Sequence, residues 1–493
     1  MRSGMRELDC IFKPRSIAVI GASDTVGKWG YMMVKRPLKT GYPGVIYPIN
    51  PNKSQILGLS AYPSVTDVPG DIDLAVITTP APTVPDIIRD CARKGIKGAV
   101  VITAGFTEAG EEGRRLEEEM VTAAREGGIR FVGPNGMGIW SEVGHLSLCF
   151  DDAPKKGPMA FVSQSGTFGG AMARVASQKG YGFSKFISIG NQADLKAADY
   201  LEYLAEDDET KVIILYLEGL KDGRRFFEIA KEVVREKPIV VYKAGRSKAG
   251  ARATMSHTAS IAGSEKVFDG MCKQVGIIQV TEAFHLFEIA EALAILPLPP
   301  GNRIAILGSG GQGVVGSDAC SAHGLELPEL DHDTSRAISA LLPPHAPQAK
   351  NPVDFAGTKR TALQEAEIIE KLLQLDYIDG VISNVPVSAQ TWDPSMEVDA
   401  NDKLSSGSLK SDIDGAMHYA SLPQTYGKPI VCIRFGRVKA DIMEQILGKG
   451  HIPIYDTPEQ CARAMAALAQ YGASRERRLV RGNRKTIPTF NVR

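Results

Sequence analysis

The most constraining feature of this chain is an alternation of short apolar runs with longer segments of helical pattern. The first apolar run is SIAVI, residues 16–20, and similar runs recur through residue 133. Strands separated by helical segments are typical of a parallel, doubly wound sheet. Two further series start near residues 158 and 303. The sequence therefore predicts an α/β fold made of three consecutive doubly wound domains.

Polar and proline-bearing segments indicate where these domains end. A chain of 493 residues exceeds what one hydrophobic core usually serves, since domains typically contain about 100 to 200 residues. Residues 151–158 are polar, and prolines cluster in LPLPPGN, residues 296–302; both patterns favour linkers. A polar stretch at residues 388–411 predicts an insertion. We expect domains over residues 1–144, 151–296 and 301–473, followed by a tail over residues 474–493.

Composition narrows the classes of ligand and the compartment. Lys plus Arg and Asp plus Glu both total 57, so no bulk charge favours nucleic acid or an anionic membrane. The seven cysteines form no CxxC pair, which fits a reducing compartment. No run of about twenty apolar residues could span a bilayer. We therefore expect a cytoplasmic protein with no membrane or nucleic-acid partner.

A glycine-rich turn follows the first predicted strand. In GASDTVGKWG, residues 21–30, Gly21, Gly27 and Gly30 would let backbone amides approach a phosphate at a helix N-terminus. The spacing departs from the dinucleotide fingerprint, so a tight structural turn stays open as an alternative. The second strand ends in NPNK with Lys53 instead of an acidic residue. A cation there suits the ribose phosphate of CoA better than the ribose of NAD.

Two similar turns start the later domains. FVSQSGTFGG, residues 161–170, places serine, threonine and glycine between a strand and a small-residue helix. These residues suit an anion site, although a plain N-cap would use them equally well. RIAILGSGGQG, residues 303–313, repeats the pattern in the third domain. The sequence thus predicts two phosphate-binding helix ends.

His257 stands apart from the other histidines because it lies in SHTASIAG, residues 256–263, among small and hydroxylated residues. A neutral imidazole is nucleophilic and can accept a phosphoryl group. Glu218 ends the apolar run KVIILYLE, and the carboxyl end of a parallel strand is where such folds present functional side chains.

In their order along the chain, these motifs resemble those of succinyl-CoA ligases and NDP-forming acyl-CoA synthetases. The resemblance covers GASDTVGKWG, NPNK, TTPAPTVP, TAGFTEAG, GPNGMG, SIGNQADL and the SHTASIAG loop. It implies an N-terminal Rossmann-like CoA-binding domain followed by two flavodoxin-like succinyl-CoA ligase-type domains. It also identifies the chain as similar to the alpha subunits of rearranged acyl-CoA synthetases, which carry both phosphate-binding helix ends.

The resemblance implies a role for individual residues. His257 would carry the phosphoryl group and Glu218 would orient it, while Ala259 departs from the glycine usual in that loop. The expected CoA contacts are Gly21, Ala22, Ser23, Gly27, Lys53, Pro80, Thr103, Ala104 and Asn135. The expected phosphate contacts are Ser165, Gly166, Thr167, Gly311, Gln312 and Gly313.

The implied reaction converts acyl-CoA, phosphate and a nucleoside diphosphate to acid, CoA and the triphosphate, reversibly. The resemblance accounts for nearly the whole chain, so we expect the ATP-grasp module on a separate beta subunit, with Mg²⁺ accompanying the nucleotide there. This chain shows no metal-ligand cluster of its own. Two alternatives stay open: a CoA-sensing module without catalysis, and a nicotinamide-dependent oxidoreductase. The acyl group and the choice between ADP and GDP are not predicted.

Overall fold

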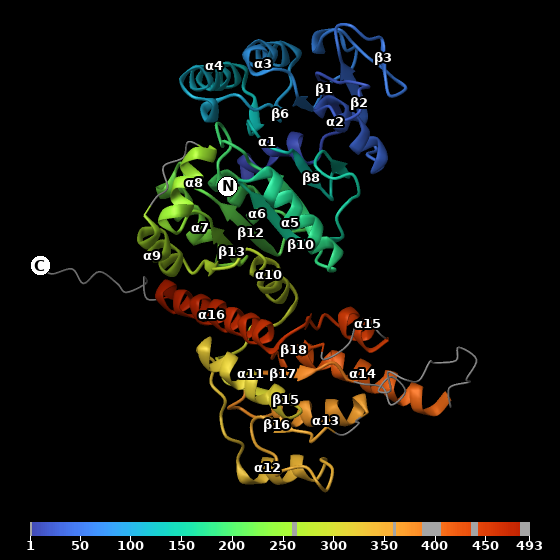
Figure 1. Ribbon diagram of the computed structural model, residues 1–493, viewed down its shortest axis with the longest axis vertical. Coiled ribbons are helices and arrows are strands. Elements are labelled where there is room, and N and C mark those ends of the chain that lie inside the picture. Colours follow the sequence, from blue (N-terminus) through green and yellow to red (C-terminus); the bar gives the residue numbers. More distant parts are fainter. Residues whose placement is uncertain (1, 259–263, 358–360, 387–405, 435–441, 484–493) are drawn as a thin grey trace, which may run out of the picture. The chain divides into compact units, whose positions relative to one another are not determined.

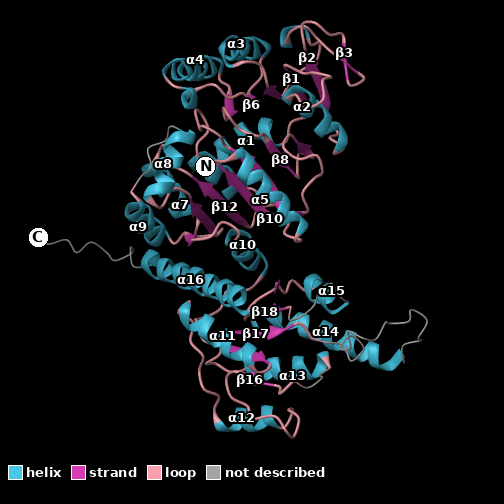
Figure 2. Ribbon diagram, in the orientation of Figure 1, coloured by secondary structure: helices cyan, strands magenta, loops and turns pink. Residues whose placement is uncertain are grey.

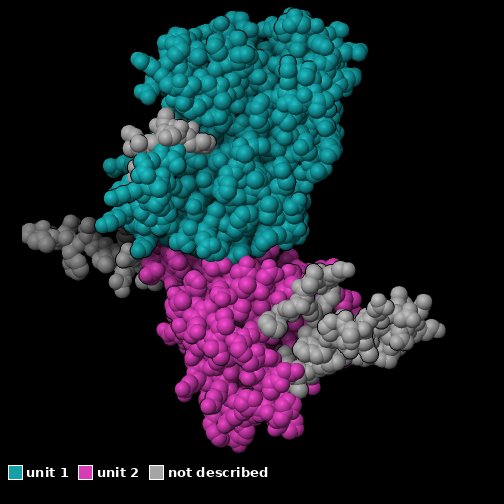
Figure 3. All heavy atoms as spheres, viewed as in Figure 1, with its two compact units in different colours: residues 1–290 teal, residues 291–493 magenta. Residues whose placement is uncertain are grey.

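A computed structural model describes residues 2–258, 264–357, 361–386, 406–434 and 442–483 (Figure 1). The chain divides into two compact units, residues 1–290 and 291–493 (Figure 3). Each unit is built on largely parallel β-sheet, and its strands (magenta) alternate with helices (cyan) in Figure 2. The predicted α/β class is confirmed.

The first unit begins with a five-stranded sheet of order β2-β1-β5-β6-β7, in which every pairing is parallel. Its strands are β1 (Ser16–Ile20), β2 (Val45–Ile49), β5 (Leu74–Ile77), β6 (Gly98–Val101) and β7 (Arg130–Val132). Its helices are α2 (Trp29–Lys39), α3 (Val84–Lys94) and α4 (Glu111–Gly127). Continuous apolar runs such as that of β1 are fully buried, as expected of parallel strands covered on both faces.

A second sheet of seven strands completes this unit, in the order β14-β13-β12-β10-β11-β8-β9. Its strands are β8 (Ile139–Ser141), β9 (Leu146–Ser147), β10 (Lys156–Ser163), β11 (Phe183–Ser188), β12 (Val212–Leu217), β13 (Ile239–Lys243) and β14 (Ile278–Val280). Its helices are α5 (Gly166–Gln178), α6 (Ala197–Ala205), α7 (Gly223–Val233), α8 (Lys248–Thr258), α9 (Glu265–Val275) and α10 (His285–Ile295). β8 and β9 join antiparallel, so the chain passes from one sheet to the other between residues 133 and 138.

Helix α1 (Arg2–Phe12) fastens the two sheets of the first unit together. The ring of Phe12 stacks on that of Tyr203 in α6, with centroids 4.6 Å apart. The Ser141 hydroxyl donates a hydrogen bond of 2.7 Å to the Phe12 carbonyl. Both Phe12 and Ser141 are fully buried, so this helix belongs to the core of the unit.

The second unit holds a five-stranded parallel sheet of order β16-β15-β17-β18-β19. Its strands are β15 (Ile304–Gly308), β16 (Val353–Asp354), β17 (Gly380–Asn384), β18 (Ile430–Ile433) and β19 (Ile454–Tyr455). Its helices are α11 (Gly311–Ala322), α12 (His332–Ser339), α13 (Ala362–Leu373), α14 (Ser406–Tyr426), α15 (Ile442–Lys449) and α16 (Pro458–Asn483). Helix α16 continues into the segment that we expected to be a tail.

Every long apolar run that predicted a strand contains one. The strands that the pattern did not reveal are short: β8, β9, β14, β16, β19 and the hairpin of β3 (Gln55–Ile56) with β4 (Leu59–Ser60). Residues 388–405, which are most of the predicted insertion, lie outside the described residues. Within the described ranges, no helix is both long and apolar enough to cross a bilayer.

Candidate functional site

A cavity of about 490 Å³ opens between the two sheets of the first unit. Its wall is formed by the segments that directly follow parallel strands β5, β6, β7, β10 and β11, together with the start of α2. The lining residues are Trp29, Thr78, Thr79, Pro80, Ile102, Thr103, Ala104, Asn135, Gly136, Met137, Gln164, Ser165, Gly166, Thr167, Gly190 and Asn191. Ligands of doubly wound proteins bind at these carboxyl ends of the strands.

Two sets of residues that the sequence assigned to different ligands share this cavity. Pro80, Thr103, Ala104 and Asn135 were expected to contact CoA, and Ser165, Gly166 and Thr167 to contact phosphate; all of them line the cavity. Gly21, Ala22, Ser23, Gly27 and Lys53 lie outside its lining. The cavity is therefore a candidate for the place where the thiol end of CoA meets phosphate.

The first glycine turn depends on glycine at two positions. Gly21 has a φ of +86°, and a Cβ there would lie 2.8 Å from Oγ1 of Thr78, which lines the cavity. A Cβ on Gly30 would lie 2.0 Å from the Gly21 carbonyl oxygen, far inside contact distance. The helix that follows has Lys28 as its N-cap with no side-chain cap hydrogen bond. No side chain therefore caps the start of α2, which is compatible with an anion at this helix end.

Lys53 lies beside this turn. Its Nζ is 2.9 Å from Oδ2 of Asp24, and the hydrogen bond from Lys53 lowers the pKa of Asp24. Asn50 ties the same two loops together by donating from Nδ2 to the Ala22 carbonyl at 2.8 Å. The structure thus brings the predicted cation to the edge of the glycine turn, where half of its side chain is exposed.

The turn after β10 combines an N-cap with an open helix end. The Ser165 hydroxyl accepts a hydrogen bond from the Phe168 amide at 3.4 Å, so the N-cap alternative is realised. One cap satisfies only one of the free N–H groups of a helix start, which leaves the anion site compatible with it. A Cβ on Gly166 would lie 2.9 Å from Cγ of Met137, so the close approach to the cavity wall requires glycine.

Glu218 is held from both sides at the end of β12. Oε1 of Gln164 accepts hydrogen bonds from the amides of Glu218 (2.8 Å) and Gly219 (3.0 Å). Lys243 donates from Nζ to the Glu218 carbonyl at 2.6 Å. Burial lowers the pKa of Lys243, against the attraction of the Glu218 carboxylate. Sequence reasoning found Glu218 but missed Lys243, because a lysine at the end of an apolar run reads as a solvated charge.

The glycine turn of the second unit has its own polar support. Gly310, with a φ of +55°, donates its N–H to Oδ1 of Asp354 at 3.1 Å. Gln312 donates from Nε2 to Oδ1 of Asn384 at 2.6 Å, and a Cβ on Gly313 would lie 3.2 Å from Cβ of Pro352. Together with Gly311, the predicted phosphate contacts Gln312 and Gly313 occupy the first turn of α11.

With this geometry in place, comparisons with known proteins are decisive. Residues 15–142 match the CoA binding domain, residues 156–293 the succinyl-CoA ligase like flavodoxin domain, and residues 303–382 the ligase-CoA domain. The ADP-forming acetate–CoA ligase II subunit alpha of Pyrococcus furiosus is 40% identical over 466 residues, covering 94% of this chain and 97% of that one. The chain belongs to the family of ADP-forming acetate–CoA ligase alpha subunits.

Other relatives show two sizes within this acid–thiol ligase family. The ADP-forming acetate–CoA ligase I of Archaeoglobus fulgidus is 38% identical over 94% of this chain, which covers 64% of that longer protein. A solved structure of the dinucleotide forming acetyl-coenzyme A synthetase 1 of Ca. Korarchaeum cryptofilum, in complex with phosphate and ADP, superposes with a TM-score of 0.83. It is 33% identical and covers 99% of both chains. The predicted family and enzyme class are confirmed, and the CoA-binding match disfavours the oxidoreductase alternative.

His257 lies in helix α8, but its side chain is outside the described residues, as is all of Ala259. The distance from its ring to Glu218 is therefore not part of the structure, and its phosphoryl-carrying role stays a prediction.

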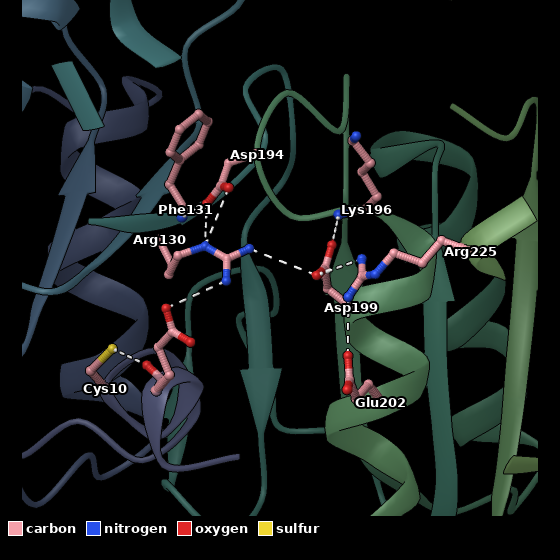
Figure 4. Close-up of polar contacts among 9 residues, drawn as sticks. Cys10, Arg130, Phe131, Asp194, Lys196, Asp199, Glu202 and Arg225 are labelled. Carbon is pink, nitrogen blue, oxygen red and sulfur yellow. Dashed lines mark hydrogen bonds and ion pairs between the residues drawn. The ribbon is translucent and has the colours of Figure 1, made fainter. Parts of the chain in front are cut away.

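An ion-pair network ties the two sheets of the first unit together (Figure 4). Arg130 in β7 pairs with Asp194, in the loop after β11, at 3.0 Å and with Glu7 in α1 at 3.5 Å. Asp199 in α6 joins Arg130 at 3.8 Å to Arg225 in α7 at 2.9 Å. These contacts fix the loop that carries Gly190 and Asn191 against the first sheet.

Two more polar residues, which the sequence did not single out, contact each other at the cavity. Asn191 lines it and is 7% exposed, and Glu108, in the TAGFTEAG motif, contacts it from behind. The available signal was an acidic residue within a motif of small residues.

Proposed function

We propose that the cavity of the first unit binds the thiol end of CoA together with phosphate, and that the chain is the CoA-binding, phosphohistidine-carrying subunit of an ADP-forming acyl-CoA synthetase. The observation that supports this is the meeting of the two predicted residue sets in one cavity. Phosphate would attack the thioester carbonyl carbon, the C–S bond would break, and CoA would leave as the thiol after taking a proton. The acyl phosphate would then pass its phosphoryl group to His257, releasing the acid.

The start of α5 would stabilise the charge of these steps. Amides at a helix N-terminus are aimed before the reaction at the place where negative charge develops. Phosphoryl transfer depends mainly on such positioning and electrostatics. The N–H groups of Gly166 and Thr167 would meet phosphate oxygens, with Ser165 holding the turn in shape. Gly311, Gln312 and Gly313 would play the same part at the start of α11.

Glu218 would orient His257 and stabilise its charged form. A carboxylate bonded to one ring nitrogen fixes the tautomer and leaves the other nitrogen as the nucleophile. The Glu218 side chain is 5% exposed, and its backbone is held by Gln164, which suits a fixed orienting group.

The CoA nucleotide would lie along the first glycine turn. Gly21, Ala22, Ser23 and Gly27 would approach its phosphates, and Lys53 would exchange Asp24 for the ribose phosphate. The pantetheine arm would then run past Pro80, Thr103 and Ala104 to Asn135.

The nucleoside diphosphate would bind elsewhere, on an ATP-grasp beta subunit that also holds Mg²⁺. The naming of the Pyrococcus furiosus relative as a subunit alpha supports a partner. In the longer Archaeoglobus fulgidus relative, the added length would supply the same module within one chain. We also place the protein in the cytoplasm, where its seven free cysteines would stay reduced.

The test is a coupled assay with the candidate beta subunit. The wild-type chain should bind CoA in preference to NAD, and should form ATP from acyl-CoA, phosphate and ADP only when the partner is added. His257→Ala should abolish ATP formation and leave CoA affinity nearly unchanged, whereas His323→Ala, a histidine of the second unit outside every predicted site, should leave both unchanged. Turnover by the His257→Ala complex would refute the phosphohistidine mechanism, and preference for NAD would refute the CoA assignment.

A further inference from the structure

Four side chains form a hydrogen-bonded row that ends at the cavity, with Glu108 and Glu117 at one end, Asn191 in the middle and Asn135 at the other end. Asn191 donates from Nδ2 to Oε2 of Glu108 at 2.5 Å and to Oε2 of Glu117 at 3.0 Å. On its other side, Oδ1 of Asn191 lies 3.3 Å from Nδ2 of Asn135. Asn135 and Asn191 both line the cavity.

The chemistry of these groups fixes which way each amide points. A carboxylate can only accept hydrogen bonds, so the atom of Asn191 that faces two of them must be its NH₂ group. The carbonyl of Asn191 then faces Asn135, which must donate a hydrogen bond to it from its own NH₂ group. The carbonyl oxygen of Asn135 is therefore turned away from Asn191.

The charge at the start of this row is well held. Oε1 of Glu108 accepts from the amides of Gly105 (2.7 Å) and Phe106 (3.2 Å). Although burial opposes it, the hydrogen bonds from Asn191 and these amides lower the pKa of Glu108. Glu117, 7% exposed, is 3.7 Å from Nζ of Lys221.

The position of Asn135 is fixed by backbone contacts as well. Its N–H donates to the Thr103 carbonyl at 2.9 Å, and the Asn191 N–H donates to the Pro134 carbonyl at 2.9 Å. Since Asn135 cannot move away from Asn191, the row controls mainly the orientation of its amide.

We propose that Glu108 is a positioning residue that acts through Asn191 to hold the carbonyl oxygen of Asn135 as an acceptor for a hydrogen-bond donor at the thiol end of CoA. The donor is the thiol S–H or the neighbouring pantetheine N–H. This inference rests on the proposed function, because it takes CoA as the ligand of the cavity.

Calorimetric titration of the full chain with CoA tests the proposal. Glu108→Gln keeps the size of the side chain but places an NH₂ group opposite that of Asn191, so only Glu117 still accepts from Asn191 and the orientation of the Asn191 amide is held less firmly. CoA affinity should fall about 3- to 10-fold, as for one lost hydrogen bond, and Asn135→Ala should cause a similar loss. The double variant should bind no more weakly than the weaker single variant, because both changes remove the same contact. Glu112→Gln, an exposed ion-paired position on the neighbouring helix, is the matched control and should bind CoA as the wild type does.

The outcomes distinguish the proposed function from the positioning role of Glu108. Failure of the wild-type chain to bind CoA would refute the proposed function itself. Normal wild-type binding with an unchanged affinity in Glu108→Gln, or with additive losses in the double variant, would overturn the positioning role. Comparison with S-methyl-CoA, which has no S–H group, identifies the donor. If the thiol donates, Asn135→Ala should reduce the affinity for S-methyl-CoA less than the affinity for CoA. If the pantetheine N–H donates, the two affinities should fall by the same factor.

Discussion

Replacement of Gln164 should separate the structural support of Glu218 from its chemistry. Oε1 of Gln164 is the acceptor for the buried amides of Glu218 and Gly219, and Gln164 itself is 4% exposed. Gln164→Ala would leave both amides without this acceptor. A buried donor without a partner costs about 1 to 3 kcal/mol, so the local free energy of opening should fall by about 2 to 6 kcal/mol.

Hydrogen exchange measures that loss where it occurs. A decrease of 2 kcal/mol corresponds to about 30-fold faster exchange, which mass spectrometry of peptides covering residues 212–222 would detect in the full chain. Gln164→Glu retains an acceptor for both amides and should keep most of the protection. It adds a negative charge beside Glu218, however, so phosphoryl transfer in the complex should fall in this variant too.

Two results would refute this reasoning. One is unchanged exchange at residues 218–219 in Gln164→Ala, which would show that its side chain is not what holds the strand end. The other is a loss of protection in Gln164→Glu as large as in Gln164→Ala, since a carboxylate is at least as good an acceptor as an amide.

Three further predictions concern charge. Lys53→Ala should weaken CoA binding about 10-fold or more, as expected for the loss of a charge-assisted hydrogen bond. It should weaken dephospho-CoA binding less, and calorimetry measures both affinities. Asp24→Asn should not weaken the binding of either ligand, since it removes only the carboxylate that competes with phosphate for Lys53. Lys185→Met would remove the cation that pairs with the buried Asp207 carboxylate at 2.6 Å, and should destabilise the chain by about 3 to 5 kcal/mol. Adding Asp207→Leu should recover much of this loss. Urea unfolding of the full chain measures the stability of both variants. Because folding lowers the pKa of Glu108, the contribution of its carboxylate to stability is present above its ordinary pKa of 4.5 and is lost as the pH falls below that value. Thermal unfolding measured at several pH values should show a smaller fall in stability on the acid side for Glu108→Gln than for the wild type.

The long strands could be predicted because their signal is local. A buried parallel strand is apolar on both faces, so SIAVI of β1 and VIILYL of β12 stand out without knowledge of their neighbours. β8 and β9 are three and two residues long, and only their antiparallel partner in the second sheet makes them strands. The predicted boundary at residue 144 placed β8 with the first domain for the same reason, and left β9 between the first two predicted domains.

The turns of the site were predictable because glycine is needed where backbones approach. Gly21 and Gly166 each face a neighbour that a Cβ would strike, and such positions leave a spacing in the sequence. The Glu108–Asn191 contact leaves none, since its members are 83 residues apart and each is polar in an ordinary loop. The same holds for the pair of Gln164 and Glu218, 54 residues apart, whose partnership only the register of β10 and β12 creates.

The placement of acidic side chains around the cavity bears on what it can bind. A site for phosphate and CoA would be weakened by nearby uncompensated carboxylates, because like charges repel most strongly where water is scarce. Glu108 accepts hydrogen bonds from backbone amides, and Glu117 forms an ion pair with Lys221. Lys243 donates a hydrogen bond to the backbone carbonyl of Glu218. Each carboxylate thus has donors or a cation beside it, which reduces its field in the cavity that the start of α5 lines. These acidic groups are therefore compatible with the anionic ligands that we propose for the cavity.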